Sequence, residues 1–196
     1  MRWGIALAFA CGCSSSSPQA PDDESPSCGT PPALAVPIAT AHVTGEPLHW
    51  RSDRCIDVTY AALSAAQVAD LEYALDAWSA VGCRSLCFYG PVESDASLKG
   101  ADGRLHVTTT THFPASSTVV YFESSGRIRG ALIDLTEAQG RGELVRQLGL
   151  DLGLGKPAAG VDSVLAPSYP IGDTTVPTAS DAEALCALYG RPPLCD

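Results

Sequence analysis

Four histidines are the side chains best suited to binding a transition metal, so their spacing is the first test for metal chemistry. They are His42, His49, His106 and His112. Two imidazoles can hold zinc from one helix face when they are four residues apart, and no pair here has that spacing. His106 and His112 flank a threonine-rich segment, and strand geometry could bring them together. A zinc site at these two residues is therefore kept as an alternative.

The cysteines offer a second source of chemistry. Cys83 and Cys87 could in principle hold a metal, but in an exported chain a disulfide is favoured. The disulfide candidates are Cys28, Cys55, Cys83, Cys87, Cys186 and Cys195, and six cysteines allow 15 pairings. Within that open set we expect Cys186 and Cys195 to close the C-terminal tail. No serine has the glycine frame of a nucleophile elbow, and Ser163 lacks it too.

The segment Arg141–Lys156 has the pattern of an amphipathic helix that ends abruptly. At about 100° per residue, four apolar side chains gather on one side and four others gather nearly opposite. Gly153 and Gly155 end the helix because glycine reaches the positive φ of a C-terminal turn, and Pro157 prevents it from resuming. The apolar side carries Leu144, Val145, Leu148 and Leu152, and the other side carries Glu143, Arg146, Gln147 and Leu150.

This segment resembles the active-site helix of the metzincin metallopeptidases, and most closely that of the matrixin group. The family pattern is His-Glu-x-x-His-x-x-Gly-x-x-His. The sequence here reads Arg146-Gln-Leu-Gly-Leu-Asp-Leu-Gly-Leu-Gly-Lys156, which keeps the leucine and glycine positions, Gly153 among them. The ligand positions carry Arg146, Leu150 and Lys156, and the general-base position carries Gln147.

These substitutions remove each role that the pattern requires. Arg146 cannot be deprotonated in a protein, Leu150 has no donor atom, and Lys156 donates a lone pair only after losing its proton. Gln147 has the shape of glutamate but cannot accept a proton as a general base. The sequence therefore predicts neither a catalytic residue, nor a bound metal, nor a cofactor at this site.

Further segments resemble matrixins in the expected order. Asp162-Ser163-Val164-Leu165 is similar to the Ser-Val-Met turn that lies beneath the metal, with Leu165 at the methionine position. Gly126–Asp134 resembles the edge strand that borders the substrate cleft. Ser180–Gly190 resembles the closing helix, and we expect a capping box between Ser180 and Glu183.

The remaining elements predict an α+β fold of the metzincin (zincin) type. The resemblance implies a twisted, mostly parallel mixed sheet with an antiparallel edge strand, two long helices and a C-terminal helix. An extended segment is expected around Ile38–Thr44. Alternating residues predict strands, and Ser64 with Gln67 forms a capping box that starts a helix. The expected strands are Cys55–Tyr60, a second one anchored by a disulfide near Phe88, Arg104–Thr109, Thr118–Phe122 and Ile128–Leu135.

The N-terminus has the features of a bacterial lipoprotein signal. One positive charge, a short apolar run and small residues precede a serine-rich stretch. We expect a signal peptide at 1–12, lipidation at Cys13 or else at Cys11, a disordered tether at 13–36 and a metzincin-like domain at 37–196. Lipidation at Cys13 leaves an even number of cysteines in the mature chain. A soluble secreted protein is the alternative.

The charge balance limits the partners. The formal net charge is -10 over 196 residues, and the sequence has no basic patch. This argues against binding nucleic acid and leaves a lipid anchor as the expected contact with a membrane. Arg146 and Lys156 would be two cations at the floor of a cleft, where acids such as Glu143, Asp151 or Asp162 could neutralise them. If these acids pair with the two cations, the cleft binds no ligand through them. Otherwise the cations could bind an anion such as the carboxylate at a peptide end.

The sequence therefore predicts a non-catalytic metzincin-like domain, used for binding a peptide or protein or for a structural purpose. One alternative is an active secreted metallopeptidase or hydrolase with unrecognised ligands. Another is an unrelated disulfide-stabilised surface lipoprotein.

Overall fold

The computed structural model describes residues 33–42, 44–94, 103–109, 117–136 and 140–190. Ala33 opens one compact unit of the chain. The predictions that concern the signal peptide, most of the tether, and residues Cys11, Cys13, Cys28, His112 and Cys195 lie outside the described residues. Val36, at the end of the predicted tether, is fully buried in the core.

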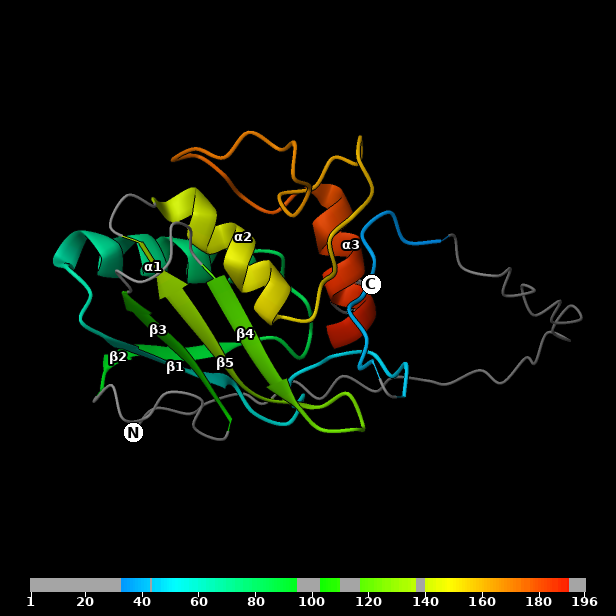
Figure 1. The fold of residues 1–196 in the computed structure, drawn as a ribbon, viewed down its shortest axis with the longest axis horizontal. Helices are drawn as coiled ribbons and strands as arrows, with labels where there is room; N and C mark the ends of the chain where they lie inside the picture. The colour runs from blue at the N-terminus through cyan, green and yellow to red at the C-terminus, as the bar shows by residue number, and fades with distance from the viewer. Residues whose placement is uncertain (1–32, 43, 95–102, 110–116, 137–139, 191–196) are drawn as a thin grey trace, which may run out of the picture. The chain divides into compact units, whose positions relative to one another are not determined.

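A five-stranded sheet forms the centre of the domain (Figure 1). Its order is β2-β1-β3-β5-β4, in which the first four strands are mutually parallel and β4 is antiparallel to β5. The predicted α+β class with a mostly parallel mixed sheet and an antiparallel edge strand is confirmed. The strands are β1 (Ile56–Ala61), β2 (Phe88–Glu93), β3 (Arg104–Thr109), β4 (Ser117–Phe122) and β5 (Ile128–Leu135).

One detail of that sheet differs from the prediction. The segment expected at the edge, within Gly126–Asp134, forms β5, which pairs with β3 on one side and β4 on the other. The antiparallel edge strand is β4 instead. The burial pattern explains the difference, because β5 is buried at six of its eight positions whereas β4 alternates between half-buried and exposed residues.

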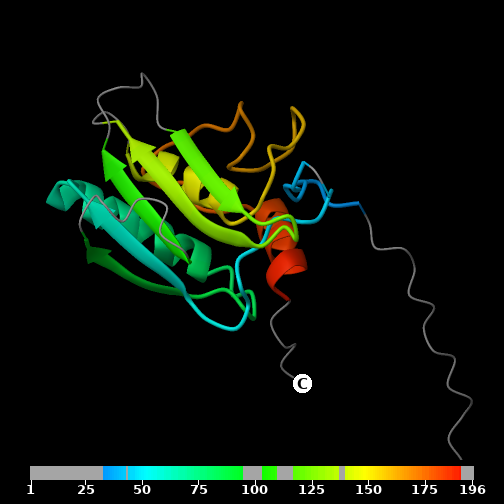
Figure 2. The same ribbon diagram turned by 60° about the horizontal axis from the view of Figure 1, so that its bottom comes forward.

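Three helices complete the domain: α1 (Ala65–Ser79), α2 (Arg141–Asp151) and α3 (Ala179–Tyr189). Two views place α1 and α2 on the same face of the sheet (Figures 1 and 2). The predicted capping box of α1 is present, with Ser64 and Gln67 bonded reciprocally. The apolar side of α2 is buried: Leu144, Val145, Leu148 and Leu152 are each at most 1% exposed.

The start of α3 corrects a second detail. Its N-cap is Thr178, and the capping box forms with Asp181 rather than between Ser180 and Glu183. Thr178 has the extended backbone of an N-cap residue. The Asp181 carboxylate is fully buried and also accepts hydrogen bonds from the turn at Ser163 and Val164, so tertiary contacts fix the helix start.

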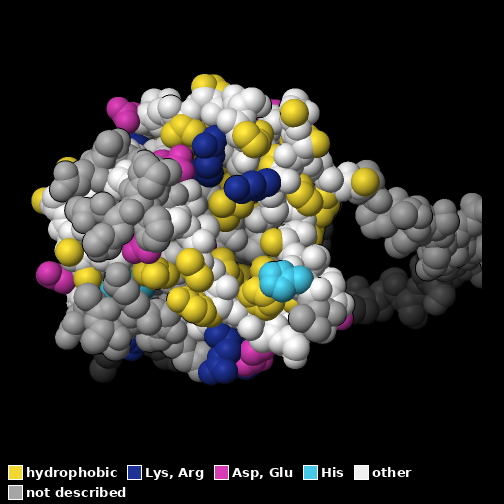
Figure 3. Space-filling model, in the orientation of Figure 1, with side chains coloured by type: hydrophobic (Ala, Val, Ile, Leu, Met, Phe, Trp, Pro, Cys, Tyr) yellow, Lys and Arg dark blue, Asp and Glu magenta, His cyan; other side chains and the backbone are white. Residues whose placement is uncertain are grey.

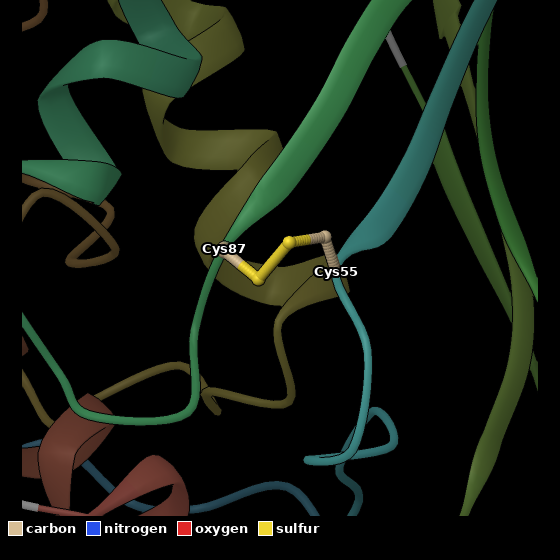
Figure 4. The surroundings of a disulfide bond; sticks show 2 residues. All are labelled: Cys55 and Cys87. Atoms are coloured by element: carbon tan, nitrogen blue, oxygen red, sulfur yellow. A yellow bond between two sulfur atoms is a disulfide. The ribbon is translucent and has the colours of Figure 1, made fainter.

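Two disulfides connect these elements, and one of them corrects the predicted pairing. Cys55 and Cys87 join the segments that enter β1 and β2 (Figure 4). Cys186 of α3 bonds to Cys83, which follows α1, and therefore not to Cys195. Both sulfur-bearing side chains of this second bridge lie in the core, where Cys186 faces the turn after α1 rather than the tail. Disulfides of this kind are typical of exported proteins.

The end of α2 is held by segments from both ends of the chain. The Trp50 indole donates to the Asp151 carbonyl at 2.7 Å, and the Tyr189 hydroxyl donates to the Leu152 carbonyl at 2.8 Å. These bonds satisfy carbonyls that a helix end leaves without partners. Gly153 then turns the chain with φ +95°, and the Leu48 carbonyl lies where a β-carbon would be. The predicted stop at Gly153 therefore has both a conformational and a steric reason.

Gly149 allows α2 to approach α1 closely, and this contact gives a first prediction. A β-carbon at this position would lie 2.6 Å from the Trp78 ring and 2.8 Å from Leu165. We expect Gly149→Ala to lower the free energy of unfolding by about 1 to 2 kcal/mol, because overpacking outweighs the better helix propensity of alanine. Urea denaturation measures this change. Gly172→Ala is the control, since Gly172 has open space around it. Equal stability of both variants would contradict the close contact.

Candidate functional site

A pocket of about 280 Å³ lies on the side of α2 opposite the apolar core. The four positions singled out in the sequence, Arg146, Gln147, Leu150 and Lys156, all line it. Figure 3 shows basic side chains next to one another in the region of α2. The remaining lining residues are Glu143, Leu165 and Pro167. The structure therefore brings together residues that are ten positions apart in the sequence, from the helix and from the segment after it.

Arg146 connects α2 to the segment that follows the helix. Its Nε donates to the Val164 carbonyl at 2.9 Å, and one terminal nitrogen donates to the carbonyls of Ala166 at 3.1 Å and Tyr169 at 3.3 Å. The other terminal nitrogen lies 3.6 Å from the Glu143 carboxylate. The guanidinium thus uses its planar set of donors on protein acceptors. It works as a clamp between helix and turn.

Glu143 and Gln147, which lie on the same side of α2 as Arg146, also bind each other. The Gln147 amide donates to the Glu143 carboxylate at 2.7 Å, one helical turn earlier. The Arg146 and Glu143 side chains are 20% and 19% exposed, so their attraction is only partly screened by water. Glu143 is thus the acid that neutralises Arg146, as the sequence suggested it could be.

Leu150 and Lys156 complete the pocket. Leu150 is half-buried against the core, and Lys156 is exposed. Gly155, just before the lysine, donates its backbone N–H to the Pro37 carbonyl at 2.7 Å, and Ile38 pairs with Leu154. The lysine is therefore positioned by the N-terminal strand-like segment. Of the extended segment expected around Ile38–Thr44, Ile38 and Thr40 form β-bridges, whereas the chain turns between Ala41 and Gly45.

The turn at Ser163–Ala166 lies beneath α2. Leu165 is buried and packs against Gly149, so it supports the helix from below at the position expected for the methionine of the family turn. The Ser163 hydroxyl donates to Asp181, and the Leu165 N–H donates to Ser163. Val164 and Ala166 present the carbonyls that Arg146 binds. The turn is consequently joined to both α2 and α3.

The donor set of this pocket does not fit a zinc ion. Zinc in proteins is held by neutral imidazole, thiolate or carboxylate. The pocket offers one carboxylate, Glu143, which is already engaged by Arg146 and Gln147. A guanidinium and an ammonium beside that acid would repel a dication. Across the described ranges, no group of three His, Cys, Asp or Glu side chains has an arrangement that could hold a metal.

The histidines have other surroundings. His106 is fully buried in β3, and its Nδ1 lies 2.9 Å from the Thr59 hydroxyl of β1. His42 is exposed and makes an edge contact with the Phe122 ring at 5.6 Å. The Nδ1 of His49 lies 2.9 Å from the Pro47 carbonyl. The alternative site at His106 and His112 stays a prediction, since His112 is not among the described residues.

Two buried ionisable groups, Asp151 and Tyr189, lie near the C-terminal end of α2. The sequence suggested Asp151 as an acid that could neutralise Arg146 or Lys156, but the structure buries it against Thr118 of β4 instead. Burial raises the pKa of Tyr189 well above its ordinary value, and its hydrogen bond from the Trp50 backbone lowers that pKa only in part. Burial also raises the pKa of the Asp151 carboxyl well above its usual range, against a smaller lowering by the Thr118 hydroxyl. Periodicity places Asp151 near the end of a helix, but only the fold reveals what packs against it.

No protein-family model matches the chain, and no curated protein matches it. Among solved structures, the chain aligns with that of myroilysin, a metallopeptidase, at a TM-score of 0.45 and 11% identity. The alignment covers 74% of this chain and 96% of myroilysin. Among the residues that the structure describes, no helix is long and apolar enough to cross a membrane.

The clamp made by Arg146 gives a second prediction. Replacing Arg146 with alanine removes its hydrogen bonds to three backbone carbonyls, of which the Ala166 carbonyl keeps the Tyr169 N–H as a donor, and hydrogen bonds to charged groups contribute about 1.5 to 3 kcal/mol. We expect Arg146→Ala to lower the free energy of unfolding by about 2 kcal/mol in urea denaturation. Arg51→Ala is the matched control, because among the described residues Arg51 bonds to Asp53 alone, at the exposed surface. A loss at Arg146 no larger than at Arg51 would contradict the clamp.

Proposed function

We propose that this chain carries a non-catalytic, metzincin-like domain, a pseudo-peptidase that serves as a binding or structural module. The single observation that supports it most is that Arg146, Gln147, Leu150 and Lys156 line one pocket. These are the positions that hold the three ligands and the general base in the motif that the helix resembles. The pocket keeps the place of an active site without its chemistry.

The side chains explain why turnover is not expected. A metallopeptidase needs a Lewis acid to polarise the peptide carbonyl and a base to activate water. Gln147 is neutral and donates its amide to Glu143. Glu143 itself accepts a hydrogen bond from Gln147 and lies beside Arg146, so its oxygens are already engaged by protein groups. With Arg146 directed at the turn and at Glu143, the charges that α2 contributes to the pocket are paired with each other. This favours a structural role or protein binding over capture of an anion.

The cell location belongs to the same proposal. The disulfides indicate an exported protein. We propose that the domain is tethered at the cell envelope by a lipid on Cys13, or on Cys11, and that it meets a peptide or protein partner there. Its net charge of -10 makes nucleic acid an unfavourable partner.

The absence of metal chemistry is directly testable. We expect the purified mature chain, dialysed against excess zinc and then freed of loose metal, to retain substoichiometric zinc by mass spectrometry. It should cleave no member of a mixed peptide library, and a chelator should leave its Tm unchanged, because no ligand set would be lost. One zinc per chain with chelator-sensitive cleavage would overturn the proposal.

Introducing histidines at the three ligand positions of the motif tests whether these positions converge. We expect the triple variant Arg146→His, Leu150→His, Lys156→His to bind one zinc per chain, because the three positions line the same pocket. Zinc at 100 times its dissociation constant should then add about 2.7 kcal/mol to the free energy of unfolding. Titration calorimetry and thermal denaturation measure both effects.

The control for that experiment is Leu150→His alone, which adds one ligand and should bind zinc weakly. Because the triple variant also loses the Arg146 clamp, circular dichroism must first show that it is folded. A folded triple variant that binds no more zinc than the single variant would mean that the positions do not converge as in a metzincin.

A further inference from the structure

Asp151 is a buried acid that the proposed function does not use. It is the last residue of α2, its side chain is 0% exposed, and it faces the edge strand β4. Its neighbours in the helix, Leu150 and Leu152, are apolar. A carboxyl group in this position is costly to keep charged.

The two carboxylate oxygens of Asp151 differ in their hydrogen bonding. Its Oδ1 contacts the Thr118 hydroxyl of β4, and that hydroxyl also lies 3.4 Å from the Leu132 carbonyl of β5. Its Oδ2 is buried and has no hydrogen-bond partner among the described residues. The contact between Thr118 and Asp151 Oδ1 is therefore a side-chain hydrogen bond that joins α2 to β4.

We propose that Asp151 is a pH-sensitive latch that fastens the edge strand β4 to helix α2. In the neutral acid, Asp151 donates its proton to the Thr118 hydroxyl, which donates in turn to the Leu132 carbonyl. In the carboxylate form, Thr118 must turn its only proton toward Asp151, and Oδ2 stays buried without a donor. The latch is therefore closed in acid and loosened as the pH rises. This inference does not depend on the proposed function.

The direction follows from linkage. Burial raises the pKa of the Asp151 carboxyl in the folded protein, while the unfolded chain keeps a value near 3.9. The folded state therefore binds the proton more tightly than the unfolded state does. The stabilisation that the protonated Asp151 gives the folded state is fully present below the pKa of the unfolded chain. It is lost as the pH rises from there toward the raised pKa of the folded protein.

Among the described residues, the charged groups on elements next to Asp151 lie elsewhere. Asp70 of α1 pairs with Arg141 at the opposite end of α2. β4 contains no Asp, Glu, Lys, Arg or His between Ser117 and Phe122. On β5, Asp134 follows Ile133, the partner of Thr118, and so lies on the opposite face of the sheet. Glu143 and Arg146 of α2 line the pocket on its other side, and the segment before β1 and α3 contribute the neutral Trp50 and Tyr189 near the helix end.

The position of β4 gives the latch a structural consequence. As the edge strand, β4 pairs with β5 alone, and its second packing partner is α2. Its Val119 and Tyr121 side chains are 44% and 45% exposed, and its apolar contact with the core comes from the half-buried Val120 and Phe122. Loosening at Asp151 should then appear as local opening of β4 while β1, β3 and β5 stay closed.

Native-state hydrogen exchange by NMR tests the latch. Protection factors exclude the intrinsic pH dependence of amide exchange. Those of the β4 amides should fall between pH 4 and pH 7, by up to about tenfold per pH unit. Amides of β3 should lose much less protection. The ¹³Cγ resonance of Asp151 should titrate well above the ordinary aspartate range.

Two variants distinguish a pH-dependent latch from a strand β4 that is unstable at every pH. Asp151→Asn cannot ionise, so its β4 protection should not vary with pH. Thr118→Val removes the hydroxyl and should weaken β4 at every pH while the dependence on pH remains. Asp76→Asn, an exposed position on α1, is the control and should behave like the parent. A flat profile in the parent, an unchanged fall in Asp151→Asn, or an ordinary ¹³Cγ titration would each overturn the proposal.

Discussion

The structure depends on how the guanidinium of Arg146 satisfies its donors. It reaches from α2 to carbonyls of the turn beneath the helix and lies beside Glu143. A half-buried cation in an apolar surrounding is stable only when it is paired and hydrogen-bonded in this way. The pairing joins helix and turn directly through protein groups. The donors of Arg146 are consequently used on the protein's own acceptors.

The two sides of α2 serve different purposes. Its inner side packs on Trp78 and Leu165, and Gly149 lets the backbone come close enough for that contact. Its outer side lines the pocket, and its last residue, Asp151, meets the edge strand. The helix end is held by Trp50 from before β1 and by Tyr189 from α3. Segments far apart in the sequence therefore fix the pocket, which makes its geometry a property of the whole fold.

Local patterns in the sequence predicted the elements well. The strands Arg104–Thr109 and Ile128–Leu135 were predicted with their observed bounds, because alternation and β-branched residues are local signals. The capping box at Ser64 and the stop at Gly153 also depend on neighbouring residues only. Leu150 and Lys156 were expected to approach Arg146 from the motif spacing, and they line the same pocket.

Properties that depend on tertiary contacts were predicted poorly. Whether a strand lies at the edge depends on its partners, so β5 was mistaken for the edge that β4 forms. The cap of α3 is at Thr178 because Asp181 also binds the turn at Ser163, which no local pattern reveals. Cys186 pairs with Cys83 across 103 residues for the same reason. The acceptors of Arg146 are backbone carbonyls, and these carry no sequence signature.

The exchange rate of the Arg146 Nε–H, measured by NMR on the ¹⁵N-labelled protein, tests the central claim most directly. We expect a resolved Nε–H signal that exchanges with solvent far more slowly than that of Arg51. Arg146 donates this proton to the Val164 carbonyl at 2.9 Å in a site where its side chain is 20% exposed, whereas Arg51 donates its Nε–H to Asp53 at the surface, where its side chain is 44% exposed. Equal exchange at the two arginines would show that the Arg146 guanidinium is free in solvent and would contradict the clamp between α2 and the turn.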